Sequence, residues 1–143
     1  VTEGIKLAKR FKLPEIVYKG IEEHHGDSVI RFFYEKAKEQ GIQVNKNEYR
    51  HLGVKPTTRE SAILMFADSL EAACRAIFMK EDANENKIRN IIEQIFNEKI
   101  SDGQLQNSPL TFKEITLIKD SFQKSLEGLY HQRVLYPEST EEE

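Results

Sequence analysis

Apolar residues recur at every third or fourth position along most of the chain, and this spacing predicts helices almost throughout. Residues 1–10 open as a helix with its apolar side chains on one stripe. A second helix begins at Pro14, because a first helical turn tolerates proline, and runs to Gly26. A third begins near Asp27 and ends with a glycine C-cap at Gly41.

In the second half of the chain, the apolar spacing and the capping residues predict three longer helices. Thr58 is the expected N-cap of a central helix over 58–79, and Asn84 opens a helix that ends near Gly103. Thr111, with a glutamate three residues later, forms a capping box for the last helix. The sequence has no β-type alternation and no internal repeat. We therefore expect an all-α domain, a helical bundle of five or six main helices.

Apolar residues show no sustained periodicity over residues 41–57, so we expect a loop there, and it is long for a compact domain. Loops of this length are usually functional or disordered. We expect a single domain over 1–137 and a disordered acidic tail over 138–143. The chain starts at Val1 inside a helical pattern with no capping sequence before it, so we expect a preceding segment in the parent protein.

The composition is that of a soluble globular protein, with 143 residues, 38% apolar and 31% charged. A net charge of -3 with mixed signs disfavours polymeric nucleic acid and anionic lipid as partners. The most apolar stretch, 62–79, carries charged residues and does not predict a membrane span. The single cysteine, Cys74, cannot form an internal disulfide, which suits the cytoplasm.

Two features suggest metal chemistry. His24 and His25 are adjacent at the end of a short helix, and Asp68 interrupts the apolar run 62–70. Imidazole and carboxylate bind hard to borderline divalent metals, and a carboxylate among apolar side chains needs a neutralising cation. Two structural alternatives remain open: the histidines simply end a helix, and Asp68 pairs with Arg75 or with a cap donor elsewhere.

Several segments together resemble the cytoplasmic HD domain of PgpH-type membrane proteins. The resemblance covers nearly the whole chain and implies the all-α HD-domain fold without its N-terminal helices. It is carried by Glu23–Ser28 with Phe32–Ala37, by Lys55–Ala73, by Asp102–Leu105 and by Tyr130–Pro137.

This resemblance implies a bacterial membrane-bound parent whose cytoplasmic domain hydrolyses cyclic di-AMP to the linear dinucleotide pApA. The family's site holds two divalent ions, manganese or iron. By resemblance, His24 and His25 are its histidine pair and Asp68 is its final aspartate. A first histidine, a His-Asp doublet and a further single histidine are expected before Val1. We therefore expect these 143 residues alone to bind metal weakly and to have little or no activity.

The resemblance also bears on the substrate. Lys55, Arg59 and Arg75 are candidate phosphate partners, each with the alternative role of an ordinary surface or ion-pair residue. In the loop, Leu52 and Val54 stand where the family pattern has two prolines, which should loosen the backbone, and His51 has no clear counterpart there.

Two other functions remain open. The chain could be a degenerate HD-like helical module that binds a ligand or partner without catalysis, or a phosphohydrolase acting on another nucleotide. An apolar face normally covered by absent helices would favour non-native association, and the pattern predicts no particular oligomeric state.

Overall fold

The computed structural model describes residues 1–41, 43–79 and 83–135, and within these the fold is helical, as the sequence predicts. The described residues contain no strand, only an isolated bridge between Val29 and Arg50. The elements are α1 (Thr2–Arg10), α2 (Glu15–Glu23), α3 (Arg31–Glu39), the 3-10 turn η1 (Lys46–Tyr49), α4 (Arg59–Phe78), α5 (Glu85–Ser101) and α6 (Phe112–Leu135).

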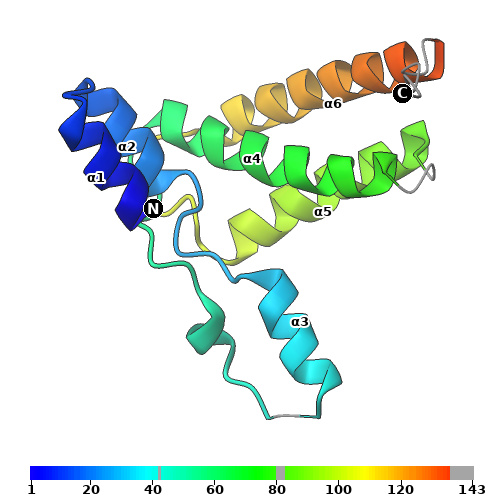
Figure 1. Ribbon diagram of the computed structural model, residues 1–143. Helices are drawn as coiled ribbons and strands as arrows, with labels where there is room; N and C mark the ends of the chain where they lie inside the picture. Colours follow the sequence, from blue (N-terminus) through cyan, green and yellow to red (C-terminus); the bar gives the residue numbers. More distant parts are fainter. Residues whose placement is uncertain (42, 80–82, 136–143) are drawn as a thin grey trace, which may run out of the picture.

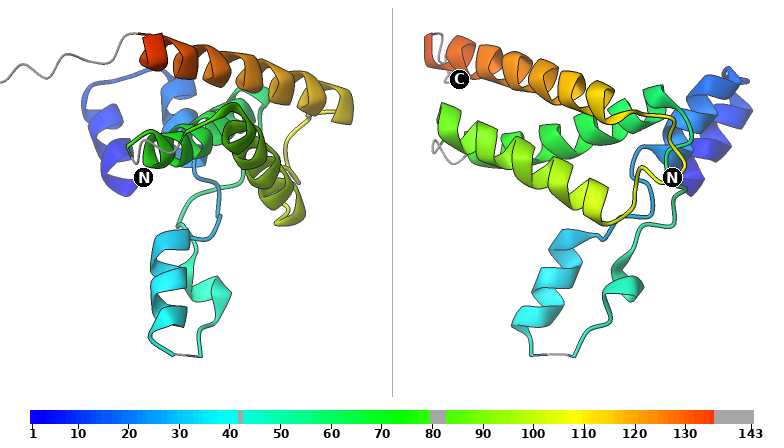
Figure 2. Two further views of the ribbon diagram at one scale, coloured as in Figure 1. Left: turned by 90° about the vertical axis from the view of Figure 1, so that its right-hand side faces the viewer. Right: turned by 180° about the vertical axis from the view of Figure 1, so that it is seen from behind.

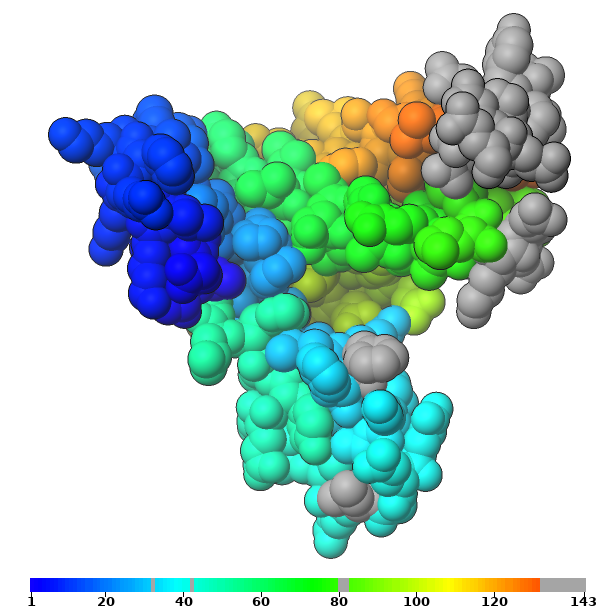
Figure 3. Space-filling view, viewed as in Figure 1, coloured from blue at the N-terminus to red at the C-terminus, as the bar shows by residue number. Residues whose placement is uncertain are grey.

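The three long helices α4, α5 and α6 form the body of the molecule, with α5 packed against both of the others (Figure 1). The short helices α1 and α2 form a hairpin that packs on the N-terminal part of α4 through α2 (Figures 1 and 2). An arm made of α3 and η1 stands out from this body, as the space-filling view also shows (Figure 3). No helix in the described residues is both long and apolar enough to cross a membrane.

The core lies between α4, α5 and α6 and is aromatic at its centre. The rings of Phe66 and Phe96 stack with centroids 4.0 Å apart and planes 7° apart. Cys74 is buried in the same cluster, consistent with a packing role, and burial raises the pKa of its thiol. The other buried members are Met65, Leu70, Ile88, Ile92, Ile95 and Leu126.

Side-chain caps fix where the long helices begin, and the predicted caps are confirmed. At α4, the Thr58 hydroxyl accepts a hydrogen bond from the Ser61 amide (3.1 Å), and the Ser61 hydroxyl accepts one from the Thr58 amide (3.2 Å). Asn84 caps α5 through its side-chain oxygen. At α6, the amide of Thr111 donates to Glu114 (2.8 Å) and the amide of Glu114 donates to the Thr111 hydroxyl (3.2 Å).

The third helix begins later than predicted, at Arg31. The prediction was wrong because the preceding residues hydrogen-bond to the distant loop instead of starting a helix. The carbonyl of Ser28 accepts from the amide of His51 (2.9 Å), and the amide of Ile30 donates to the carbonyl of Tyr49 (2.6 Å). These backbone bonds hold the chain extended, so the capping potential of Asp27 is not used for a helix.

The loop over 41–57, apart from residue 42, is fastened to the body at two places. The Arg50 guanidinium makes a bidentate ion pair with Asp102 (2.8 and 2.9 Å) just after α5. Further along, Thr57 donates to the side chain of Glu23 at the end of α2. The loop therefore joins α2, α4 and α5 around one region. The predicted domain end at 137 and the tail over 138–143 lie outside the described residues.

Candidate metal centre

The histidine pair lies where α2 ends and the chain turns toward α4. His24 still has helical backbone angles, but Gly26 takes a positive φ of 59° that ends the helix. A side chain at Gly26 would collide with Gln104, whose own side chain accepts from the next amide, that of Asp27 (3.2 Å). The turn places the two imidazoles side by side, with ring centroids 3.8 Å apart.

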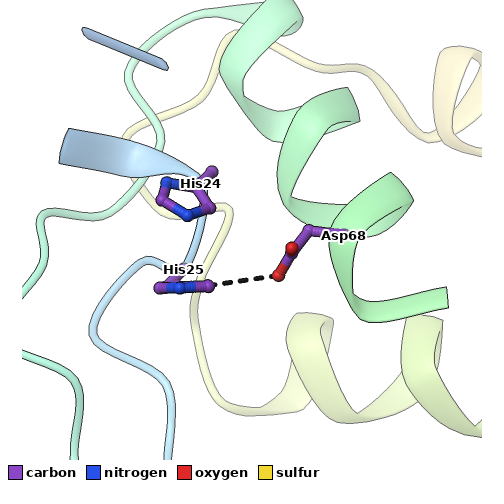
Figure 4. Close-up of side chains that lie close together, drawn as sticks. All are labelled: His24, His25 and Asp68. Atoms are coloured by element: carbon purple, nitrogen blue, oxygen red, sulfur yellow. Dashed lines mark hydrogen bonds and ion pairs between the residues drawn. The ribbon is translucent and has the colours of Figure 1, made fainter. Parts of the chain in front are cut away.

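Asp68 approaches the pair from the middle of α4 (Figure 4). Its Oδ2 lies 3.1 Å from the Nδ1 of His25, across 43 positions of sequence. One ligand atom from each of His24, His25 and Asp68 can be chosen so that all lie within 4.8 Å of one another. The structure thus brings together the three residues that the sequence singled out as candidate ligands.

The ring of His24 is oriented with one nitrogen available as a ligand. Its Nδ1 lies 2.9 Å from the carbonyl of Ile21 and 3.1 Å from the carbonyl of Gly20. Because a carbonyl oxygen can only accept, Nδ1 carries a proton, and the tautomer that this selects for the neutral ring has its lone pair on Nε2. Fixing a histidine tautomer through its second nitrogen is the usual way that proteins prepare an imidazole for a metal.

The donor set and its surroundings fit a divalent cation. The side chains of His25 and Asp68 are 31% and 42% exposed, so an ion can reach them, and Asp68 is less enclosed than its apolar run suggested. Burial and the neighbouring His24 lower the pKa of His25, although Asp68 acts in the opposite direction. His25 is therefore neutral near pH 7, which is the form that binds metal.

Glu23 links the end of α2 to the loop before α4 and to the first turn of α4. Its side chain is only 2% exposed and accepts hydrogen bonds from the Thr57 amide and hydroxyl (2.8 Å each) and from the Ser61 hydroxyl (2.5 Å). Burial by itself would raise the pKa of Glu23, but the bonds from Ser61 and Thr57 outweigh it and lower the pKa. Because Glu23 directly precedes the histidine pair, these bonds fix His24 relative to α4.

A cavity of about 320 Å³ opens beside two of the three candidate ligands. His25 and Asp68 form part of its wall. His51, from the loop, stacks on His25 with ring centroids 4.5 Å apart, and burial and the neighbouring His25 lower the pKa of His51. Lys99, near the end of α5, also lines the cavity, and sequence reasoning missed it because helical periodicity alone does not distinguish it from a surface lysine.

The sequence profile of the HD domain family matches residues 1–73, just over half of the chain. The chain belongs to the HD domain family.

Curated relatives of this HD domain cover nearly all of it. The chain is 39% identical over 139 residues to the cyclic-di-AMP phosphodiesterase PgpH of Bacillus subtilis (strain 168), covering 97% of the chain and 19% of that protein. It is 36% identical over 136 residues to the PgpH of Listeria monocytogenes (serotype 1/2a, strain 10403S), covering 95% of the chain and 18% of that protein. The chain therefore spans less than a fifth of these relatives.

Solved structures agree with the HD-domain fold. The crystal structure of the L. monocytogenes PgpH HD domain superposes with a TM-score of 0.80 at 34% identity, over 91% of this chain and 59% of that one. The same domain in complex with cyclic-di-AMP gives 0.83 at 36% identity, over 94% and 62%. These matches confirm the resemblance expected from the sequence.

The three basic residues predicted as phosphate partners lie elsewhere in this HD domain. Arg75 forms an exposed ion pair with Glu71 (2.5 Å) and borders a different cavity between α4 and α6. Arg59 pairs with Glu114 (2.9 Å), and Lys55 donates to the side chain of Gln106 (3.3 Å). None of the three is among the residues that line the cavity beside Asp68. The alternative pairing of Asp68 with Arg75 is not formed, since the Asp68 carboxylate contacts His25.

Proposed function

We propose that the chain forms part of a metal-dependent phosphohydrolase site that hydrolyses cyclic di-AMP to pApA in the parent protein. The observation that carries the proposal is the convergence of His24, His25 and Asp68, of which His25 and Asp68 line one cavity. It is supported by the similarity to proteins named cyclic-di-AMP phosphodiesterase and to an HD domain solved with that dinucleotide.

The proposed cofactors are two divalent ions, manganese or iron, held in the complete domain. His24 would contribute its Nε2, His25 a ring nitrogen of its neutral imidazole, and Asp68 a carboxylate oxygen. Bound there, such ions would polarise the phosphodiester and lower the pKa of a water molecule so that hydroxide is available near neutral pH. Glu23 keeps the histidine pair in register with Asp68 and needs no contact with the substrate for this.

These residues are too few to hold two ions by themselves. A carboxylate and two imidazoles fill one metal's protein positions at most, and the sequence contains no His-Asp doublet. We therefore expect the 143 residues alone to bind metal weakly and to hydrolyse little. The full-length protein is accordingly the sample in which the proposed activity is to be measured.

The proposal extends to location and partners. By resemblance to PgpH-type proteins, the parent is a bacterial membrane protein with this domain on its cytoplasmic side. The substrate is a cyclic dinucleotide, and a net charge of -3 without a basic surface run gives no reason to expect a nucleic acid polymer.

The test is hydrolysis by the full-length protein loaded with Mn²⁺, offered cyclic di-AMP, other cyclic dinucleotides and mononucleotides. We expect pApA from cyclic di-AMP, with His24→Asn and Asp68→Asn each lowering both bound manganese and activity. The loss should exceed the roughly 10- to 100-fold that even an indirect change near a metal causes. His131→Asn is the matched control, since His131 pairs with Glu85 (3.1 Å) far along the chain.

Two results would change the conclusion. Cleavage of a different nucleotide in preference to cyclic di-AMP would keep the phosphohydrolase and replace its substrate. Manganese bound without cleavage of any phosphoester would instead leave a degenerate HD-like module that binds a ligand or partner without catalysis.

A further inference from the structure

Lys99 has an unusual environment for a lysine at a helix end. It lies in the last turn of α5 and lines the cavity that also contains His25 and Asp68. Its Nζ donates a hydrogen bond to the hydroxyl of Ser28 (2.8 Å), and burial lowers the pKa of the ammonium group. Ser28 in turn donates to the carbonyl of His25. This two-step connection fixes the ammonium group relative to a candidate metal ligand.

The charge of Lys99 lacks a carboxylate in contact. Within residues 1–41, 43–79 and 83–135, no acidic side chain lies within ion-pair distance of its Nζ. Asp68, Glu98 and Asp102 act on it only at longer range. The other cationic side chain on this wall, Arg31, is already paired with Glu98 (2.6 Å).

A half-buried ammonium group with only a neutral hydroxyl as partner can bind an anion without first breaking an ion pair. Withdrawing a cation from water is costly unless an opposite charge compensates it. An anion entering this cavity would supply that charge, and the site of the proposed hydrolysis adjoins it through His25 and Asp68. A phosphate group of the substrate would carry the compensating negative charge and would lie at the site of hydrolysis. Lysine is also a common phosphate ligand.

We propose that Lys99, positioned by Ser28, binds a phosphate oxygen of the dinucleotide and so holds the substrate beside His25 and Asp68. This inference rests on the proposed function and assigns a substrate-binding residue to the same site. The competing explanation is purely structural: a cation in the last turn of a helix interacts favourably with the helix dipole, and that interaction affects stability without affecting substrate binding.

The test compares Lys99→Met, Lys99→Arg and the exposed control Lys113→Met in the full-length, Mn²⁺-loaded protein. We expect Lys99→Met to lower kcat/KM for cyclic di-AMP by about 10- to 100-fold, mainly through KM, as for a lost hydrogen bond to a charged group. Lys99→Arg should recover most of the loss because it keeps the charge. Bound manganese should be the same in all variants, and Lys113→Met should match the unmodified protein.

A second measurement needs no substitution and therefore does not depend on a variant folding. Trace acetylation of the unmodified protein is followed by mass spectrometry with and without a slowly hydrolysed phosphorothioate analogue of cyclic di-AMP. The analogue should slow acetylation of Lys99 and leave that of Lys113 unchanged.

The failures of the two proposals differ. If the unmodified protein cleaves cyclic di-AMP but Lys99→Met has unchanged kinetics, the role of Lys99 is overturned and the proposed function stands. The same holds if the analogue does not protect Lys99 from acetylation. Absence of phosphoester cleavage by the metal-loaded, unmodified protein overturns the function and the role of Lys99 with it.

Discussion

Replacing Glu23 tests whether the buried carboxylate beneath the histidine pair holds the site together. Glu23→Gln can keep the same geometry: its oxygen can accept from Thr57 and Ser61, while its amide donates to the Thr57 hydroxyl. What it loses is the charge. Hydrogen bonds to a charged group contribute about 1.5–3 kcal/mol against about 1 for neutral ones, so Glu23→Gln should cost about 1–3 kcal/mol.

Truncation should cost more than neutralisation. Glu23→Ala removes every acceptor and leaves the buried Thr57 amide without its partner, and breaking such a network typically costs about 3–5 kcal/mol. The predicted order of stability is therefore the unmodified protein, then Glu23→Gln, then Glu23→Ala. Both variants should also weaken manganese binding, because His24 follows Glu23 directly and loses its fixed position relative to α4.

The loss should depend on pH in a defined direction. The pKa of Glu23 is lowered in the folded protein from its ordinary value of 4.5, so its contribution is complete above 4.5. As the pH falls below 4.5 and through the folded-state pKa, the carboxyl becomes neutral and resembles glutamine. The stability difference between the unmodified protein and Glu23→Gln should therefore be largest at neutral pH and shrink in acid.

Urea unfolding followed by circular dichroism, repeated from neutral to acidic pH, measures these differences. Glu22→Gln is the matched control, because Glu22 is the exposed neighbour of Glu23 and should change stability little. Equal losses in Glu22→Gln and Glu23→Gln, or a difference for Glu23→Gln that does not shrink in acid, would refute the reasoning.

Three further predictions follow from single residues. Phe66→Ala should lower the free energy of unfolding by about 3–5 kcal/mol in urea titrations, because the side chain is fully buried, and a loss below 1 kcal/mol would contradict the assigned core. Arg50→Lys should speed limited proteolysis of the loop over 41–57, because lysine cannot reproduce the bidentate pair with Asp102; an unchanged cleavage pattern would show that the pair does not hold the loop. Gly26→Ala should cost about 1–3 kcal/mol and weaken manganese binding, because a side chain there meets Gln104 at a positive φ; calorimetry and metal titration check both effects.

The success of the helix predictions has a local cause. Periodicity and capping are properties of residues a few positions apart, so the starts of α4, α5 and α6 could be read from Thr58, Asn84 and Thr111. The start of α3 could not be read in this way. The backbone groups of Ser28 and Ile30 hydrogen-bond to a loop some twenty residues away, and such long-range pairing leaves no local pattern in the sequence.

The same distinction between local and long-range information applies to the candidate metal site. The residue types and positions of His24, His25 and Asp68 were sufficient to single them out by sequence, with the family resemblance assigning their roles. Their convergence within 4.8 Å depends on the turn at Gly26 and on the packing of α2 against α4.

The sequence by itself determined the helices, most of their caps and the candidate ligands, because these follow from residue type and short spacing. Only the tertiary structure decided which polar groups from distant parts of the chain are neighbours: it placed Asp68 against His25 and Lys99 in the cavity beside them, whereas the Glu71–Arg75 pair follows from their spacing of four within one helix. The physical reason is that electrostatic partners are chosen by distance in space, and residues forty or more positions apart are brought within a few ångströms only when the helices pack.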